Sequence, residues 1–379
     1  MLLLSAVALF ILEILTNSLN TQKNAWDFVY YLSMAKDGFH ASPMASPFAY
    51  RYLTPLLVHV LFLAGIPINI GFSLLAYLGG ITQLTGIFFF VKWLTHSSRG
   101  AYLAMSITAL SLFNIKFLLF DIYRPDHLAY GLILLQTYFA FKKNFFPLLV
   151  MTAIASQIRE FNIIPLAAYL FMELRTEDRR GLIQQITLST ICLAPAIILP
   201  RLLIPVTENY QIIGLSSDAI ITTLILPFLP SVDVNFIFSI AAYFLPLLFI
   251  ADLKTIKTTF QSLPEDQRRY LAAYTALVLF LSFLGGTDFN RFATFLFLPQ
   301  IILIGLLTPS ITNPQIGFML ASTFIFNRIW AYFPDWDVEK YRDFYGGFSL
   351  RLNMSTAYRI LEYIGFLAFG HFVRVRFDK

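Results

Sequence analysis

Long apolar segments recur from one end of the chain to the other, and they constrain its fold more than any other feature. Each approaches the roughly 17–25 residues that a helix needs to cross a bilayer. Hydrophobic residues make up 58% of the 379 residues and charged residues 13%, a composition too apolar for a soluble protein of this size. The sequence therefore predicts an all-α, polytopic transmembrane helix bundle.

About ten spans are predicted, with short re-entrant and interfacial helices beside them. The predicted spans cover residues 1–19, 69–91, 101–119, 127–141, 186–205, 234–251, 270–286, 292–308, 315–333 and 357–373. Three further apolar pieces, 53–65, 145–172 and 219–230, do not fit as simple spans.

We expect one transmembrane domain over residues 1–379, because no internal repeat and no long polar region divides the chain. Residues 20–68 are predicted to form an outer loop with interfacial helices. Residues 334–356 are predicted to form a second outer loop, too short to fold as a separate soluble domain. The chain has a single cysteine, Cys192, so no disulfide bond is expected within it.

Segment 145–172 decides the predicted topology, because polar residues interrupt it at 157–162. If the segment crossed once, the basic residues at 142–143 and 175–180 would lie on opposite faces, although Lys and Arg tend to stay on the cytoplasmic side. Two short helices that meet at 157–162 and return place both basic loops on one face. The same tendency accounts for the net charge of +5 without a nucleic-acid partner.

This topology gathers the unusual polar residues on the outer face. The segments concerned are 20–52, 121–127, 157–162, 285–291 and 334–356. Helices that stop inside a membrane are tolerated where they line an enclosed or water-filled cavity. We therefore expect a cavity that opens toward the outer leaflet.

The first outer loop contains a predicted interfacial helix at residues 26–38, with Asp27, Tyr30, Tyr31 and Met34 on one face. A carboxylate beside hydrocarbon is costly, so an acid in this place often has a function. One interpretation makes Asp27 the catalytic base that deprotonates an acceptor hydroxyl, with the tyrosines shaping the cavity. The alternative is an anchor helix whose N-terminus Asp27 stabilises.

Arginines provide the candidate phosphate contacts. Arg51 lies between aromatic residues, where it either extends to the lipid boundary or binds a phosphate with two hydrogen bonds. Arg159 and Glu160 interrupt an apolar run, so they form either an ion pair that fixes the packing or part of a cavity floor for an anionic ligand. We favour the ligand site, and we favour Arg159 over Arg51 as its phosphate contact.

The sequence DIYRPDH places Asp121, Arg124, Asp126 and His127 at the outer end of a span. Asp126 is either a structural acid near a helix N-terminus or a second catalytic group, which would share the work of base and of cation or hydroxyl ligand with Asp121. Arg124 and His127 are candidate substrate ligands. One Asp–His pair is not a convincing metal site, so no cofactor is predicted and a divalent metal stays open.

The sequence GGTDFNR places Asp288 and Arg291 at the outer face as well. One interpretation is an ion pair that joins two helix ends. The other makes Arg291 a second phosphate contact, with Asp288 in the same substrate site.

The pattern resembles the GT-C superfamily of integral-membrane glycosyltransferases. A first span precedes an outer loop with an early acid (AWDFVYYLSMA), a further acid follows the third span (RPDH), and PFAYRYLTPLL and SQIREFNIIPL look like segments of bacterial relatives. The resemblance covers roughly residues 1–170. The chain differs from larger members because no soluble C-terminal domain is expected, and its first-loop motif lacks the paired acids.

The resemblance implies a polyprenyl-phosphate-linked sugar as donor and transfer on the extracytoplasmic face of a bacterial inner membrane. Asp27 falls at the position of the catalytic acid, and Asp126 falls near the second acid. Base catalysis of this kind contributes ~10²–10⁴-fold, and a single base without a covalent intermediate predicts inversion. The acceptor, a glycan, lipid or protein, stays open.

Other classes of membrane protein use similar features. A transporter or flippase of lipid-linked saccharides also has broken helices and buried charge, although it usually shows repeat symmetry. A polysaccharide polymerase or ligase would share the donor lipid and the outer arginines. A purely structural subunit would not explain the interruption at 157–162.

Overall fold

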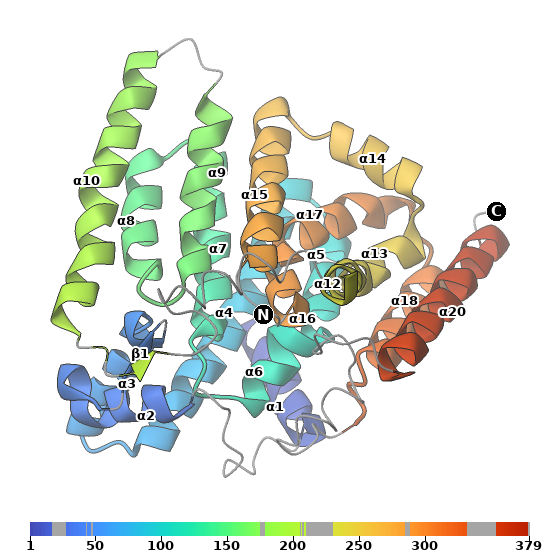
Figure 1. Ribbon diagram of the computed structural model, residues 1–379. Helices are drawn as coiled ribbons and strands as arrows, with labels where there is room; N and C mark the ends of the chain where they lie inside the picture. The colour runs from blue at the N-terminus through green and yellow to red at the C-terminus, as the bar shows by residue number, and fades with distance from the viewer. Residues whose placement is uncertain are drawn as a thin grey trace.

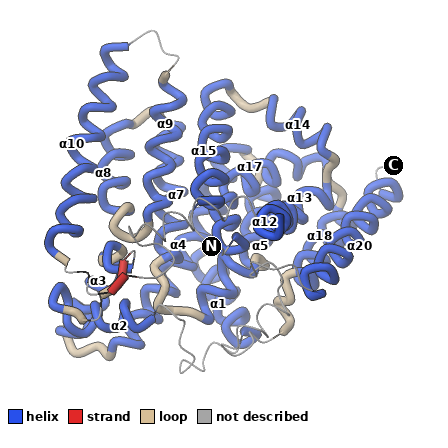
Figure 2. Tube along the Cα trace, viewed as in Figure 1, coloured by secondary structure: helices blue, strands red, loops and turns tan. Residues whose placement is uncertain are grey.

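The computed structural model describes residues 1–16, 28–42, 44–46, 48–174, 179–204, 206, 208–209, 230–284, 289–331 and 354–377. Over these residues the protein is built from helices (Figures 1 and 2). The exception is a two-residue parallel pairing between β1 (Ala45–Ser46) and β2 (Glu208–Asn209). The all-α prediction is therefore confirmed at this level.

One helix at the candidate site, α16 (Phe289–Ala293), belongs to the second half of the chain, and the other helices around the site belong to the first half. Ten α-helices are described in the first half. They are α1 (Leu2–Thr16), α2 (Phe28–Asp37), α3 (Leu53–Leu63), α4 (Ile68–Thr95), α5 (Ser98–Ala109), α6 (Phe117–Phe120), α7 (Asp126–Phe141), α8 (Phe145–Ala155), α9 (Ile164–Glu173) and α10 (Arg179–Leu203). Shorter helical turns join some of them, namely η1 (Gly38–His40), η2 (Phe48–Tyr50), η3 (Leu112–Lys116) and η4 (Glu160–Ile163).

The second half continues the bundle. Its helices are α12 (Pro230–Tyr243), α13 (Leu245–Ile250), α14 (Leu253–Gln261), α15 (Glu265–Leu284), α16 (Phe289–Ala293), α17 (Phe297–Leu307), α18 (Asn313–Phe326) and α20 (Met354–Phe377), with the turns η6 (Thr294–Leu296) and η7 (Thr308–Ser310).

Several helices have the length and composition of membrane spans. Among the described residues, three qualify alone, namely Ile68–Thr95, Arg179–Leu203 and Arg291–Ser310. A fourth is possible if Ser98–Ala109 and Asn114–Phe120, bent by 66°, form one span. Each of the ten predicted segments overlaps a helix, but the predicted count of ten is not established by length and composition.

The segment 145–172 forms two short helices, α8 and α9, that run side by side in opposite directions (Figure 1). Lys143, just before α8, lies 3.9 Å from Glu173 at the end of α9 and 2.6 Å from Asp266 at the start of α15. Its hydrogen bond to Asp266 raises the pKa of Lys143, so the side chain stays charged. The predicted return of this segment is confirmed, because both of its ends lie together.

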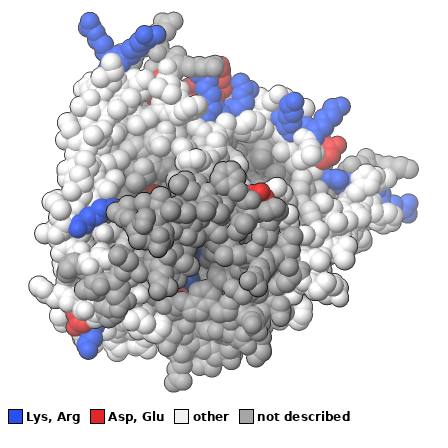
Figure 3. Space-filling model, in the orientation of Figure 1, with Lys and Arg blue, Asp and Glu red and all other residues white. Residues whose placement is uncertain are grey.

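Basic side chains gather at the end of the molecule where α8 begins. Figure 3 shows Lys and Arg along the edge that α10, α15, α14 and the end of α20 form in Figure 1. The sequence supplies Arg179 and Arg180, Arg268 and Arg269, Lys254 and Lys257, and Arg374 and Arg376 to these elements. The short helices α2 and α3 lie at the opposite end (Figure 1). This polarity agrees with the predicted placement of the basic loops on one face.

Glycines let α4 and α7 pack closely at the start of α7. A Cβ atom on Gly79 of α4 would come within 2.8 Å of the backbone carbonyl carbon of His127, and a Cβ on Gly131 of α7 within 3.0 Å of the Thr82 side chain. Close contact of backbones requires residues without a side chain. The N-terminus of α7, which carries Asp126, is therefore held against α4.

Candidate functional site

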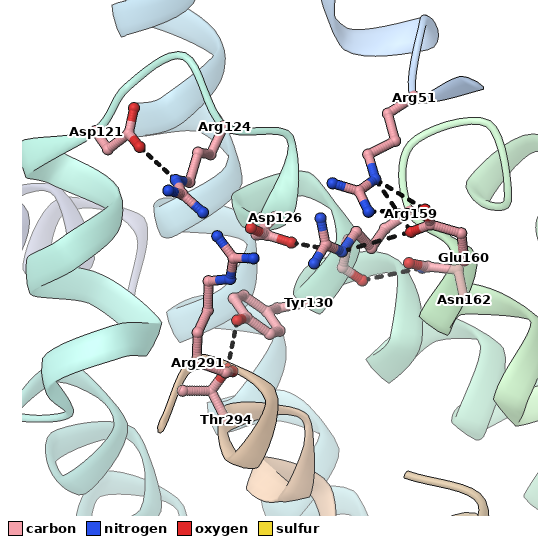
Figure 4. Close-up of polar contacts among 11 residues, drawn as sticks. Arg51, Asp121, Arg124, Asp126, Tyr130, Arg159, Glu160, Asn162, Arg291 and Thr294 are labelled. Carbon is pink, nitrogen blue, oxygen red and sulfur yellow. Dashed lines mark hydrogen bonds and ion pairs between the residues drawn. The ribbon is translucent and has the colours of Figure 1, made fainter. Parts of the chain in front are cut away.

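Three elements meet near the N-terminus of α7: the start of α7 itself, the turn between α8 and α9, and α16 (Figure 4). At their centre Arg159 Nε lies 3.0 Å from Asp126 Oδ1. The two side chains are 2% and 1% exposed, so water cannot replace either partner. The turn thus carries a buried arginine, as the interruption of the apolar segment predicts.

Arg51 and Glu160 extend this pair into a chain of alternating charge. Arg51 follows η2 and donates from Nε and from a terminal nitrogen to Glu160 Oε1, at 2.9 and 2.8 Å. Glu160 Oε2 also lies 3.7 Å from Arg159 Nε. Glu160 therefore stands between two arginines, and the structural ion pair predicted as an alternative for Glu160 is present.

The turn is fixed to α7 by a buried network of amides. Asn162 donates to the carbonyl oxygen of Ala129 at 3.1 Å, and Gln136 donates to the Asn162 carbonyl oxygen and to Thr152 Oγ1, each at 2.8 Å. In a low-dielectric interior such a network makes one geometry specific. The sequence analysis missed Gln136, although a lone amide within the predicted span 127–141 is a usable signal.

Aromatic stacking joins the turn to the segment that carries Arg291. The ring of Phe161 stacks on Phe292 at 5.5 Å and on Phe295 at 4.3 Å between centroids. Tyr130 of α7 shares a 2.6 Å hydrogen bond with Thr294. These contacts hold α16 beside α7, and the Arg291 side chain points into the space occupied by Arg124 and Asp126 (Figure 4).

The two aspartates of DIYRPDH have different surroundings. Asp121 pairs with Arg124, whose guanidinium lies over the Phe117 ring at 5.0 Å. Asp126 faces Arg159, but neither of its carboxylate oxygens accepts a hydrogen bond of good geometry from the described residues. Asp126 therefore retains acceptor capacity inside the site.

The tyrosines of α2 support Arg51 from the other side. Tyr31 is 2% exposed and meets the Phe48 ring edge-on at 6.0 Å, and Tyr30 stacks on the same ring at 5.2 Å. The Arg51 guanidinium lies over this ring at 5.5 Å. His127 is fully buried, and neither of its ring nitrogens has a hydrogen-bond partner among the described residues. A ligand role for His127 stays a prediction. The short helix predicted in the first outer loop is confirmed over Phe28–Asp37.

Two of the predicted site residues, Asp27 and Asp288, lie outside the described residues, as do residues 334–353 of the second outer loop. Their roles stay predictions. Within the described part of the chain, no three His, Cys, Asp or Glu side chains are grouped to hold a metal ion.

The arrangement brings together the guanidinium groups of Arg51, Arg124, Arg159 and Arg291 with three carboxylates (Figure 4). Guanidinium groups bind phosphate through paired hydrogen bonds, and a carboxylate with free acceptor capacity can take a proton. Comparison with protein-family models, curated proteins and solved structures gave no match.

Proposed function

We propose that this protein is a GT-C-type membrane glycosyltransferase. It transfers a sugar from a polyprenyl-phosphate donor to an acceptor hydroxyl, with inversion, on the extracytoplasmic face. The proposal includes a bundle of about ten spans in a bacterial inner membrane, with the basic end of the molecule in the cytoplasm and the arginine-rich site at the outer end.

One observation carries the proposal: Arg159, buried at the turn between the short helices α8 and α9, faces Asp126, and further arginines lie around this pair (Figure 4). Ionisable groups at this depth are expensive and usually mark a functional site. Guanidinium groups gathered at one turn suit a site that receives an anion, such as the phosphate of a lipid carrier.

The reaction is a direct displacement at the anomeric carbon. The acceptor oxygen forms the new bond while the bond to the lipid phosphate breaks, and the acceptor proton passes to Asp27. The polyprenyl phosphate leaves with an added negative charge, which Arg159 and Arg291 neutralise; fixed cations of this kind are often the largest contribution to catalysis. Arg51 and Glu160 orient Arg159, and Asp126 holds its other side.

The test uses purified protein in nanodiscs and a panel of polyprenyl-phosphate sugars that carry a label on the sugar. We expect one donor to lose its label from the lipid, to an added acceptor or to water. Asp27→Asn should abolish this loss while donor binding persists. Lys143→Ala, at the opposite end of the hairpin, is the matched control and should leave the rate unchanged.

Two results would contradict the proposal. If every donor keeps its label, or if the label crosses the membrane still attached to the lipid, the protein is not a transferase, and the second result indicates a flippase. If Asp27→Asn retains full activity, the assignment of the base is wrong.

A further inference from the structure

A polar cavity lies between α5, α12, α13, α17, α18 and α20, apart from the arginine cluster. The centre of a water molecule can move within about 50 Å³ of it. On that measure a bound water needs roughly 10–15 Å³, so the cavity has room for several waters or for one polar ring. Its polar walls are formed by Ser111, Ser239, Tyr243, Gln300, Thr323, Asn327 and Arg359.

The hydroxyl groups of these walls already donate their protons to the protein. Ser239 donates to the Asn235 carbonyl oxygen at 2.7 Å and Thr323 to the Met319 carbonyl oxygen at 2.8 Å. A hydroxyl that has used its proton still offers oxygen lone pairs as acceptors. These two groups therefore face the cavity as acceptors and need a ligand that donates.

The other end of the cavity repeats this pattern. The hydroxyls of Ser111 and Tyr243 both donate to Asn114 Oδ1, at 3.0 and 2.9 Å. The buried Asn114 Nδ2 has no hydrogen-bond partner among the described residues. Four hydroxyls thus present acceptor sites, whereas Arg359 of the wall already donates to Glu362 at 2.5 Å and to the Phe326 carbonyl oxygen at 3.1 Å. The cavity is therefore a poor match for a phosphate or carboxylate, which can only accept and would have to displace Glu362.

The apolar part of the wall also fits a particular shape. Phe238 and Phe326 line the cavity beside the hydroxyls. A sugar ring combines hydroxyl donors at its edge with C–H groups on its faces, and aromatic side chains are suited to pack against such faces. Polar groups at the depth of a membrane helix are retained where they line a cavity with polar contents.

We propose that this cavity binds one sugar ring, or an equally hydroxylated group, through acceptor oxygens on α12 and α18. It is separate from the arginine cluster, since no arginine or carboxylate of that cluster lines its wall. Binding there requires no transfer reaction, so the proposal stands or falls independently of the enzymatic one.

The test measures binding of tritiated octyl β-D-glucopyranoside to the protein in nanodiscs free of glycolipid and of sugar-based detergent. Binding to empty nanodiscs is subtracted. We expect saturable binding that weakens about tenfold or more in the double variant Ser239→Ala/Thr323→Val, because each lost hydrogen bond accounts for roughly two- to tenfold. Thr108→Val is the matched control: its hydroxyl also donates to a carbonyl one turn earlier, Ala104 at 3.0 Å, but lies outside the cavity wall.

A filling variant, Ala242→Phe, places a ring in the cavity and should abolish binding. This second test keeps all the hydroxyls and asks only whether the cavity is where the sugar binds. Absence of saturable binding to the unaltered protein would mean that the cavity holds water alone and would overturn the proposal. Binding that changes less than twofold in both the double variant and the filling variant would overturn it as well, because the sugar would then bind elsewhere.

Discussion

Breaking the ion pair between Arg159 and Asp126 should destabilise the protein strongly. The two side chains are 2% and 1% exposed and their charged atoms lie 3.0 Å apart. Removal of one member of such a pair leaves a buried charge without its partner, which costs about 3–5 kcal/mol. In Asp126→Asn, Arg159 keeps a contact of 3.7 Å to Glu160, but Glu160 is already bound by Arg51.

A double-mutant cycle separates the pair from the effects of each substitution. We expect Asp126→Asn and Arg159→Met together to lose about 2–3 kcal/mol less stability than the sum of the single variants. The assay is equilibrium unfolding in mixed micelles, followed by helical circular dichroism. The control cycle uses Lys143→Ala and Asp266→Asn, a pair of 2.6 Å whose side chains are 54% and 46% exposed, where about 0–1 kcal/mol is expected.

The reasoning is refuted if the coupling between Arg159 and Asp126 falls below about 0.5 kcal/mol, the usual scatter of additive sites. It is also refuted if the exposed control pair couples as strongly. Either result would mean that water or other groups solvate Arg159, and that the turn between α8 and α9 is not a dry, charge-balanced site.

Two further substitutions test how the site is positioned. Gly79→Ala should destabilise by about 1–3 kcal/mol through overpacking against the backbone of His127, whereas Gly317→Ala in α18, where a Cβ meets nothing within 4 Å, should be neutral or stabilising by up to about 1 kcal/mol. Phe161→Leu removes the stack on Phe295 at 4.3 Å and should lose about 1–2 kcal/mol. Unfolding of each variant under one set of conditions checks both, and an unchanged Gly79→Ala would contradict the close packing of α4 and α7.

The class of fold and the return of segment 145–172 were predictable because each follows from a property added up over many residues, namely apolar length and loop charge. Apolar length predicts membrane helices, and the sign of the loop charges distinguishes a hairpin from a crossing. The breaks within individual predicted spans were not predictable. The predicted span 101–119 bends by 66°, and the predicted span 234–251 divides into α12 and α13 at Phe244. Such breaks depend on what packs against the helix.

The membership of the site was predictable in part. Arg51, Asp126, Arg159 and Glu160 attract notice as charges in apolar surroundings, and they lie together. Which carboxylate meets which arginine was not predictable, because Arg51 and its partner Glu160 are 109 residues apart in the sequence. Supporting residues such as Phe161 look like ordinary core residues until the stacked rings are seen.

Buried basic side chains lie at two helix breaks, Lys116 at one and Arg159 at the other. The groups that each side chain contacts indicate whether it only supports the fold or is available to a ligand. Lys116 lies in the π-helical turn η3 and is 0% exposed; its Nζ donates to the carbonyl oxygens of Arg328, at 2.6 Å, and Ala331. Those carbonyls belong to the turn and bend that follow α18, so the fold itself uses Lys116. Arg159, at the other break, faces a carboxylate that accepts no well-aligned hydrogen bond from the described residues. A ligand can therefore enter the charge network of Arg159 without removing a hydrogen bond that the fold requires, which makes this break the better candidate for chemistry.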